Sequence, residues 1–198
     1  MKRILALLIA GLSLFGCVED KTAVREESQA QTAQKLEATL AGIPGIAPDT
    51  IIAYPRWLDK QTLAIDFLAY KVTTKSVFGT AINLDYDSKV LEYNSYKKGD
   101  FLEQGGTPAG NQPPVYLVSP ANSGVSGNNS LIIGASLFRG TPGVTGSGRL
   151  LTLIFHARQS APTKIAITKG KLKSLQADDI SGIHWPNSIK IIGTGEIE

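Results

Sequence analysis

The chain has 198 residues and a formal net charge of +3, so it lacks the strongly basic character of a nucleic-acid-binding protein. Its single cysteine excludes an intrachain disulfide framework. The 20 glycines and 10 prolines, with one methionine, favour many turns and short strands over long helices.

Residues 1–16 have the build of a signal peptide. Two basic residues precede an apolar stretch, 4–14, that is short for a membrane span. Residues 14–17, LFGC, resemble the lipobox of bacterial lipoproteins, although a phenylalanine stands where a small residue is usual. The resemblance implies that Cys17 becomes the acylated first residue and anchors the protein in a bilayer. The alternative is an ordinary signal peptide or a short membrane anchor with an incidental cysteine.

Val18, directly after this cysteine, bears on the choice of membrane. In bacteria with two membranes, an aspartate at this position commonly retains a lipoprotein in the inner membrane. By the same resemblance, we expect the outer membrane of the cell envelope. Exposure to the periplasm or to the outside stays open.

Residues 17–49 are interpreted as a lipidated tether. From residue 18 to 41 the chain is rich in Ala, Gln, Glu and Lys and has no glycine or proline, which favours a helix. The apolar positions form only a weak stripe, namely Val24, Ala30, Ala33, Leu36 and Leu40. We expect a partly helical tether, with a partner-binding helix as the alternative. Because residues 42–49 hold two prolines and two glycines, the folded domain is expected at 50–198.

Nearly every later segment has strand character, and residues 62–74 show a long alternating pattern. About ten strands are predicted, at 51–54, 62–74, 77–86, 90–96, 115–119, 130–138, 149–158, 164–168, 171–174 and 188–192. No long helix is available for crossover connections, so the strands are expected to pair mainly antiparallel. The predicted fold class is all-β, an antiparallel β-sandwich, with a closed barrel as the alternative.

Two motifs, in this order among the strands, resemble those of cohesin-type domains. In the first, a strand ends at Tyr86 and Asp87, a short turn precedes Leu91, and Gly-Asp-Phe-Leu follows at 99–102. In the second, a strand of small residues is followed by a Pro-Gly turn and a Gly-Ser-Gly step into an apolar strand. Its residues are Gly134, Ala135, Ser136, Pro142, Gly143, Val144, Gly146, Ser147, Gly148, Leu151 and Phe155.

The similarity covers roughly residues 62 to 192. It departs at Ser88, where the family usually has proline, and it offers no close match for residues 103–130. It implies a cohesin-like jelly roll of about nine to ten strands that binds a protein partner, such as a dockerin, through one sheet face. Asp87 is expected to close its turn by accepting a backbone hydrogen bond, and Gly146 and Gly148 to permit a bulge or tight turn.

The residue patterns suited to catalysis or metal binding have simpler explanations. His156 and His184 lack Cys, Asp or Glu at metal-binding intervals. Turn chemistry accounts for the acids at 85–87 and 178–179, with calcium binding as the alternative. The glycine-rich residues 140–148 lack a Gly-Lys-Ser or Gly-Lys-Thr ending and precede a strand. We therefore predict no catalytic residue, no metal site, no cofactor and no enzymatic activity.

Tyr54, Trp57 and Trp185 stand close to prolines, where a flat ring can stack on a sugar or anchor a protein partner. They are candidate binding residues, with closure of the sandwich ends as the alternative. The leading hypothesis is a membrane-anchored docking module that recognises a dockerin or another envelope protein. A polysaccharide-binding surface lipoprotein and an accessory subunit of a secretion or pilus machine are the alternatives, and no nucleic-acid partner is expected.

Overall fold

A computed structural model describes residues 45–105, 112–122 and 127–193. The predicted leader, Cys17 and most of the predicted tether lie outside these ranges. Within them the chain forms β1 (Thr50–Trp57), β2 (Thr62–Val77), β3 (Gly79–Asp87), β4 (Leu91–Lys98), η1 (Leu102–Gly105), β5 (Val115–Asn122), β6 (Asn128–Ser136), β7 (Val144–Ala157), β8 (Thr163–Lys173) and β9 (Ser188–Ile191).

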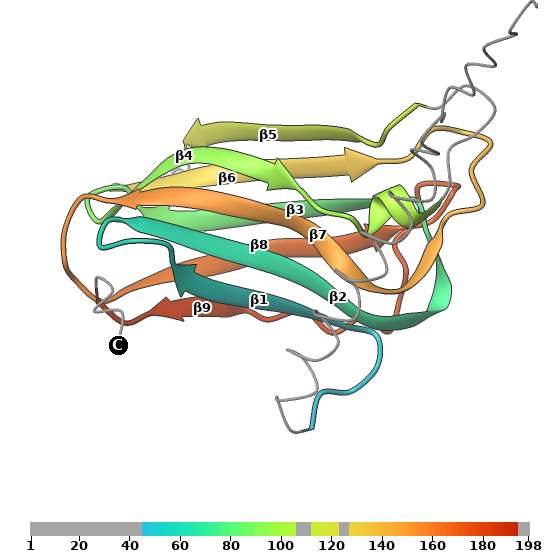
Figure 1. Cartoon of the computed structure of the whole chain (residues 1–198), viewed down its shortest axis with the longest axis horizontal. Helices are drawn as coiled ribbons and strands as arrows, with labels where there is room; N and C mark the ends of the chain where they lie inside the picture. Colours follow the sequence, from blue (N-terminus) through green and yellow to red (C-terminus); the bar gives the residue numbers. More distant parts are fainter. Residues whose placement is uncertain (1–44, 106–111, 123–126, 194–198) are drawn as a thin grey trace, which may run out of the picture.

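The strands form two antiparallel sheets that pack face to face (Figure 1). One sheet has four strands in the order β1-β2-β7-β4, and the other has five in the order β5-β6-β3-β8-β9. The predicted β-sandwich is therefore confirmed. No helix in the described part of the chain is long and apolar enough to cross a bilayer.

One detail of the strand prediction is wrong. Residues 164–168 and 171–174 were expected as two strands, but the structure has one continuous strand, β8. The sequence suggests a break because Gly170 lies in the middle of this region. In the structure Gly170 stays in the strand, where it pairs with Ile82, and the ring of Trp185 occupies the space where a side chain would be.

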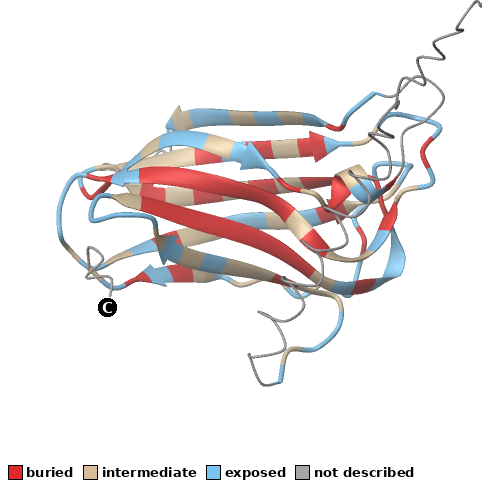
Figure 2. Cartoon of the chain, in the orientation of Figure 1, coloured by how far each residue is buried: buried red, intermediate tan, exposed pale blue. Residues whose placement is uncertain are grey.

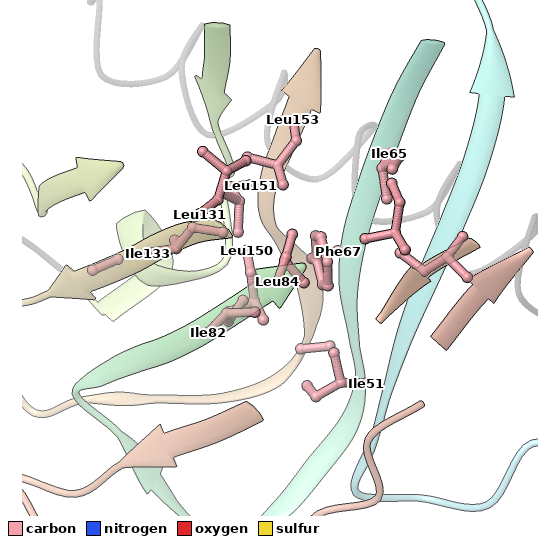
Figure 3. Close-up of a cluster of buried hydrophobic side chains, with 14 of the residues drawn as sticks. Ile51, Ile65, Phe67, Ile82, Leu84, Leu131, Ile133, Leu150, Leu151 and Leu153 are labelled. Carbon is pink, nitrogen blue, oxygen red and sulfur yellow. The ribbon is translucent and has the colours of Figure 1, made fainter. Parts of the chain in front are cut away.

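The core lies between the sheets and is built from alternate residues of facing strands (Figure 3). Leu63, Ile65 and Phe67 of β2 face it, as do Ile82 and Leu84 of β3. Each such side chain contributes about 1.5–3 kcal/mol when fully buried. The Phe155 ring adds edge-to-face contacts with Tyr86 at 5.2 Å and Tyr93 at 6.0 Å between ring centroids.

Four residues of the first motif have structural roles. Asp87 Oδ1 accepts a hydrogen bond of 2.8 Å from the Lys89 N–H, as predicted, and Leu91 is buried. At Gly99 a Cβ would lie 1.8 Å from the Arg149 carbonyl oxygen, so only glycine fits. Asp100 Oδ1 then accepts a hydrogen bond of 2.7 Å from the Arg149 N–H.

The second motif packs against the first, although the two are far apart in the chain. A Cβ at Gly148 would lie 3.0 Å from Phe101, so this glycine lets the two segments approach closely. Gly146 has φ of +98°. Where β2 pairs with β7, the register shifts between Phe67 and Leu68 and leaves Leu150 of β7 as the extra residue. The predicted bulge therefore lies in β7 at Leu150, just after these glycines.

Candidate docking surface

The outer face of the five-stranded sheet is the strongest candidate for a binding surface. Alternation along β5 directs Tyr116 and Val118 to the core and leaves Val115 and Leu117 on the outside. Ile132 of β6 lies on the same outer face, since its neighbours Leu131 and Ile133 are both buried. Val115, Leu117 and Ile132 have exposed fractions of 53%, 62% and 45%, which is high for aliphatic side chains in a sheet.

The middle of this face is flat because small residues occupy it. One row of paired residues crosses the sheet. It runs from Leu117 of β5 through Gly134 of β6 and Ala81 of β3 to Lys171 of β8. The glycine and alanine leave a shallow strip between an aliphatic edge and a basic edge. We call this surface the docking face and define it by Val115, Leu117, Ile132, Gly134, Ala81, Asn83, Lys169 and Lys171.

Lys169 and Lys171 line the β8 side of the docking face, and Lys173 follows them two residues further along β8. Asp179, in the loop after β8, holds two of them: its carboxylate is 2.6 Å from Lys173 Nζ and 3.3 Å from Lys171 Nζ. These contacts, that of Lys173 first, lower the pKa of Asp179. Both of these ammonium groups are paired with Asp179, whereas Lys169 is exposed beside Asn83, which lies between it and Ile132.

A tyrosine of the edge strand ties the aliphatic side of the docking face to the opposite sheet. The Tyr116 hydroxyl donates to the carbonyl oxygens of Leu150, at 3.2 Å, and Gly99, at 3.3 Å. Its ring stacks on Tyr96, with ring centroids 6.2 Å apart. Burial, more than any other influence, raises the pKa of Tyr116 well above its ordinary value. Val115 and Leu117 are therefore held in place by the inward side chain between them.

The three predicted aromatic binding residues do not share a surface. Tyr54 is 42% exposed on the outer face of the four-stranded sheet, whereas Trp57 points to the core from the same strand. Trp185 packs against the core and Gly170, next to His184, which bridges to Thr50 at the other end of β1. Trp57 and Trp185 therefore lie beside opposite ends of a strand about 23 Å long.

The acidic and histidine residues considered in the sequence are also dispersed. Asp85 accepts a hydrogen bond from the Ser130 hydroxyl, and Asp179 pairs with lysines as described. His156 is exposed on β7 of the four-stranded sheet, and His184 lies in the connection before β9. Within residues 45–105, 112–122 and 127–193, no three His, Cys, Asp or Glu side chains are grouped as metal ligands.

The docking face was not predicted from the sequence, although a signal for it was present. Residues 115–118 are all apolar or aromatic, so whichever alternate set fills the core, apolar side chains remain outside. Ile132 and Ile133 are adjacent in a strand, so one of them must point away from the core between the sheets. Alternation alone did not show which of the two alternate sets of side chains faces the core.

With its two stacked antiparallel sheets, the domain belongs to the class of jelly-roll β-sandwiches. Neither a protein-family model nor a curated protein sequence matches the chain. Solved structures of cohesin modules are similar to it. The second type II cohesin module of the adaptor ScaA scaffoldin of Acetivibrio cellulolyticus has a TM-score of 0.54 and 16% identity, over 74% of this chain and 96% of that one.

Two more cohesins support the same assignment. The third cohesin of ScaC from Acetivibrio cellulolyticus, solved in complex with the ScaB dockerin, has a TM-score of 0.52 and 12% identity, over 69% of this chain and 91% of that one. A non-cellulosomal cohesin of the archaeon Archaeoglobus fulgidus has a TM-score of 0.50 and 15% identity, over 73% and 91%. The described domain has the cohesin-type fold that its two motifs predicted.

Proposed function

We propose that this protein is a non-enzymatic docking module that binds a protein partner, a dockerin or another envelope protein, on the docking face. The observation that carries the proposal is the exposure of Val115, Leu117 and Ile132 on one flat sheet face. Exposed apolar side chains gathered on one rigid face are typical of sites that are covered by a partner.

The fold adds independent support. The ScaC cohesin was solved in complex with a dockerin, and a type II cohesin of Acetivibrio cellulolyticus, with a TM-score of 0.52 to this chain, was solved with an X-dockerin partner. At 12% and 16% identity these structures share the fold with this chain, so the partner is inferred from the surface itself.

The surface favours a partner with an apolar stripe flanked by acidic residues. The aliphatic side chains of β5 and β6 would cover the stripe, and each half-exposed residue would contribute on the order of 1 kcal/mol on burial. Lys169 stands on the other side of the small-residue strip and would face carboxylates of the partner.

A paired substitution tests the docking face. We expect Leu117→Asp to abolish capture of the partner, because a carboxylate would replace a central apolar contact; a loss of about 2 kcal/mol or more corresponds to roughly 30-fold weaker binding. Tyr54→Asp is the matched control, since Tyr54 is similarly exposed but lies on the other sheet. Pull-downs from envelope extracts, followed by calorimetry with the purified partner, measure both variants.

Two results would count against this proposal. One is equal loss of binding in both variants, which would place the contact elsewhere or indicate a general defect. The other is the absence of any specific partner in extracts and in titrations with purified dockerins.

A membrane anchor is part of the same proposed function. The lipobox-like residues at 14–17 support acylation of Cys17, and Val18 supports delivery to the outer membrane. We expect Cys17→Ser to move the protein from the membrane fraction to the soluble fraction and to abolish labelling with palmitate. Retention of both in the variant would contradict the anchor and leave the docking proposal to its own test.

A further inference from the structure

On the outer face of the four-stranded sheet, the outward-pointing side chains of the two central strands are buried, which is unusual for the surface of a sandwich. Residues 63–69 of β2 and 150–155 of β7 are buried without interruption, so the central strands are covered on both sides (Figure 2). In the five-stranded sheet, by contrast, β3 shows an alternation of buried and partly buried residues from Thr80 onward. An unbroken buried run is typical of a strand with both faces covered.

Matched residues on the two outer faces show the difference. Ile154 of β7 and Ile132 of β6 both point outward from inner strands, yet Ile154 is 6% exposed and Ile132 is 45% exposed. Ala64 of β2 is 0% exposed, whereas Ala81 of β3 is partly exposed. Position within the sheet therefore does not explain the burial.

The described side chains account for only part of this cover. Leu68 is packed by Ile46, Ile52 and Tyr70, and Asp66 is held by Arg56 at 2.7 Å and Arg149 at 3.5 Å. Ala64 and Ile154 belong to neither hydrophobic cluster formed by the described residues. No described strand or helix lies over this face.

The buried area is a narrow strip. Its outward-facing members are Ala64, Asp66 and Leu68 of β2 and Thr152 and Ile154 of β7. Tyr54 and Arg56 on one side and Ser95 and Lys97 on the other are exposed. Two strands lie about 4.8 Å apart, so the strip has the width of a single helix, about 10 Å. With a length of about 13 Å its area is about 130 Å², much smaller than the roughly 800 Å² that each partner buries in a dimer interface.

We propose that the N-terminal segment of the same chain, residues 18–41, lies as an amphipathic helix on this strip. The position where the described chain begins supports the assignment: Ile46, just after the segment and its Gly-Pro connection, already packs on Leu68 at one end of the strip. The segment is therefore delivered to this face and needs no long span to reach it.

The length and chemistry of the segment fit the strip. Its apolar positions Ala30, Ala33, Leu36 and Leu40 span about 15 Å of helix, and the strip from Ala64 to Leu68 is about 13 Å long. Its small alanines allow a helix to approach the sheet closely. The segment holds five acidic and three basic residues, which complements the arginines beside the strip.

Packing of this segment gives the two faces of the sandwich different roles. The segment covers the four-stranded sheet, and the docking face on the opposite side of the sandwich stays free for a partner. With the segment packed, the domain would lie closer to a membrane anchor at Cys17 than it would with the tether extended. This role of the segment does not depend on the identity of the partner.

Thiol labelling of the full mature chain tests the proposal. In a Cys17→Ser background, Ala64→Cys supplies the only thiol, and Ellman's reagent measures its accessibility. We expect slow labelling, and we expect Leu36→Asp with Leu40→Asp to accelerate it roughly tenfold or more by releasing the segment. Gln31→Asp with Gln34→Asp adds the same charge away from the stripe and should leave the rate unchanged. Ala81→Cys, on the docking face, should label rapidly in every background.

Each other outcome would overturn the proposal. Rapid labelling of Ala64→Cys in a chain with the unaltered segment would show that the face is open. Slow labelling that stays slow after the Leu36 and Leu40 substitutions would show that something else covers it. Slow labelling that depends on protein concentration, with a dimer in light scattering, would identify a second copy as the occupant. Ile154→Cys provides a second reporter on the same strip if Ala64→Cys perturbs folding.

Discussion

The Tyr116 hydroxyl binds the edge strand β5 to the opposite sheet. Tyr116→Phe should therefore lower the stability of the domain at β5 without changing the side chains exposed on the docking face. The hydroxyl donates to Leu150 O and Gly99 O. Leu150 O also accepts from the Gly99 N–H, but the carbonyl of Gly99 would lose its partner. Removal of one buried hydrogen-bonding partner costs about 1–3 kcal/mol, and we expect a loss of about 1–2 kcal/mol because tyrosine and phenylalanine rings pack alike.

Urea denaturation measures this loss, and amide hydrogen exchange locates it. We expect Tyr116→Phe to accelerate exchange more in β5 than in β3, relative to the unaltered protein, since β5 is an edge strand paired on one side with β6. Tyr96→Phe is the matched control, because Tyr96 is in the same ring stack but its hydroxyl forms no hydrogen bond within the described residues. Equal destabilisation by the two variants would refute the reasoning.

The same residue predicts a pH dependence. Because burial raises the pKa of Tyr116 in the folded state, its contribution to stability is complete below the ordinary tyrosine pKa of about 10 and is lost as the pH rises beyond it. We expect Tyr116→Phe to reduce the loss of stability between about pH 10 and 12 relative to the unaltered protein. Identical alkaline unfolding curves would contradict this assignment.

Three further predictions concern stability and are measured by chemical or thermal denaturation. Gly170→Ala should destabilise the domain by about 1–3 kcal/mol, because the new Cβ would lie 2.4 Å from the Trp185 ring, whereas Gly134→Ala, with no atom within 4 Å, should have little effect. Asp66→Asn should cost about 1–3 kcal/mol, since this buried carboxylate is 2.7 Å from Arg56 Nε; no change would show that the charge is dispensable. The Thr73 N–H lowers the pKa of Asp49, so Asp49 stabilises the fold above about pH 4 and loses that effect in acid. Asp49→Asn should therefore differ from the unaltered protein at pH 7 and converge with it near pH 2, within the noise of the measurement.

Local sequence signals predicted those features that depend on neighbouring residues. Strand segments could be recognised because alternation and turn residues act over a few positions. The turn at Asp87 was predicted correctly for the same reason, since the bond from Lys89 spans two residues. The break predicted between residues 168 and 171 was wrong because the glycine there, Gly170, is explained by a distant residue, the Trp185 ring that occupies the space of a side chain.

Surface roles were harder to predict than strands. Tyr54, Trp57 and Trp185 were candidates because each stands close to a proline, but strand geometry directs them to separate places. Their part in glycan binding stays a prediction, which titration of Trp57→Ala and Trp185→Ala with polysaccharides would test. The exposed Leu117 and Ile132 looked like ordinary core residues in the sequence.

By itself the sequence determined that this domain is built from strands, where several turns fall, and which residues of each strand share a side. It also supports the prediction of a lipid on Cys17. Only the tertiary structure decided which side is inside: in β5 and β6 apolar residues remain at the surface, and in β2 and β7 outward residues are buried. The reason is physical, since alternation is a property of one strand, whereas burial depends on distant segments that come to lie on it.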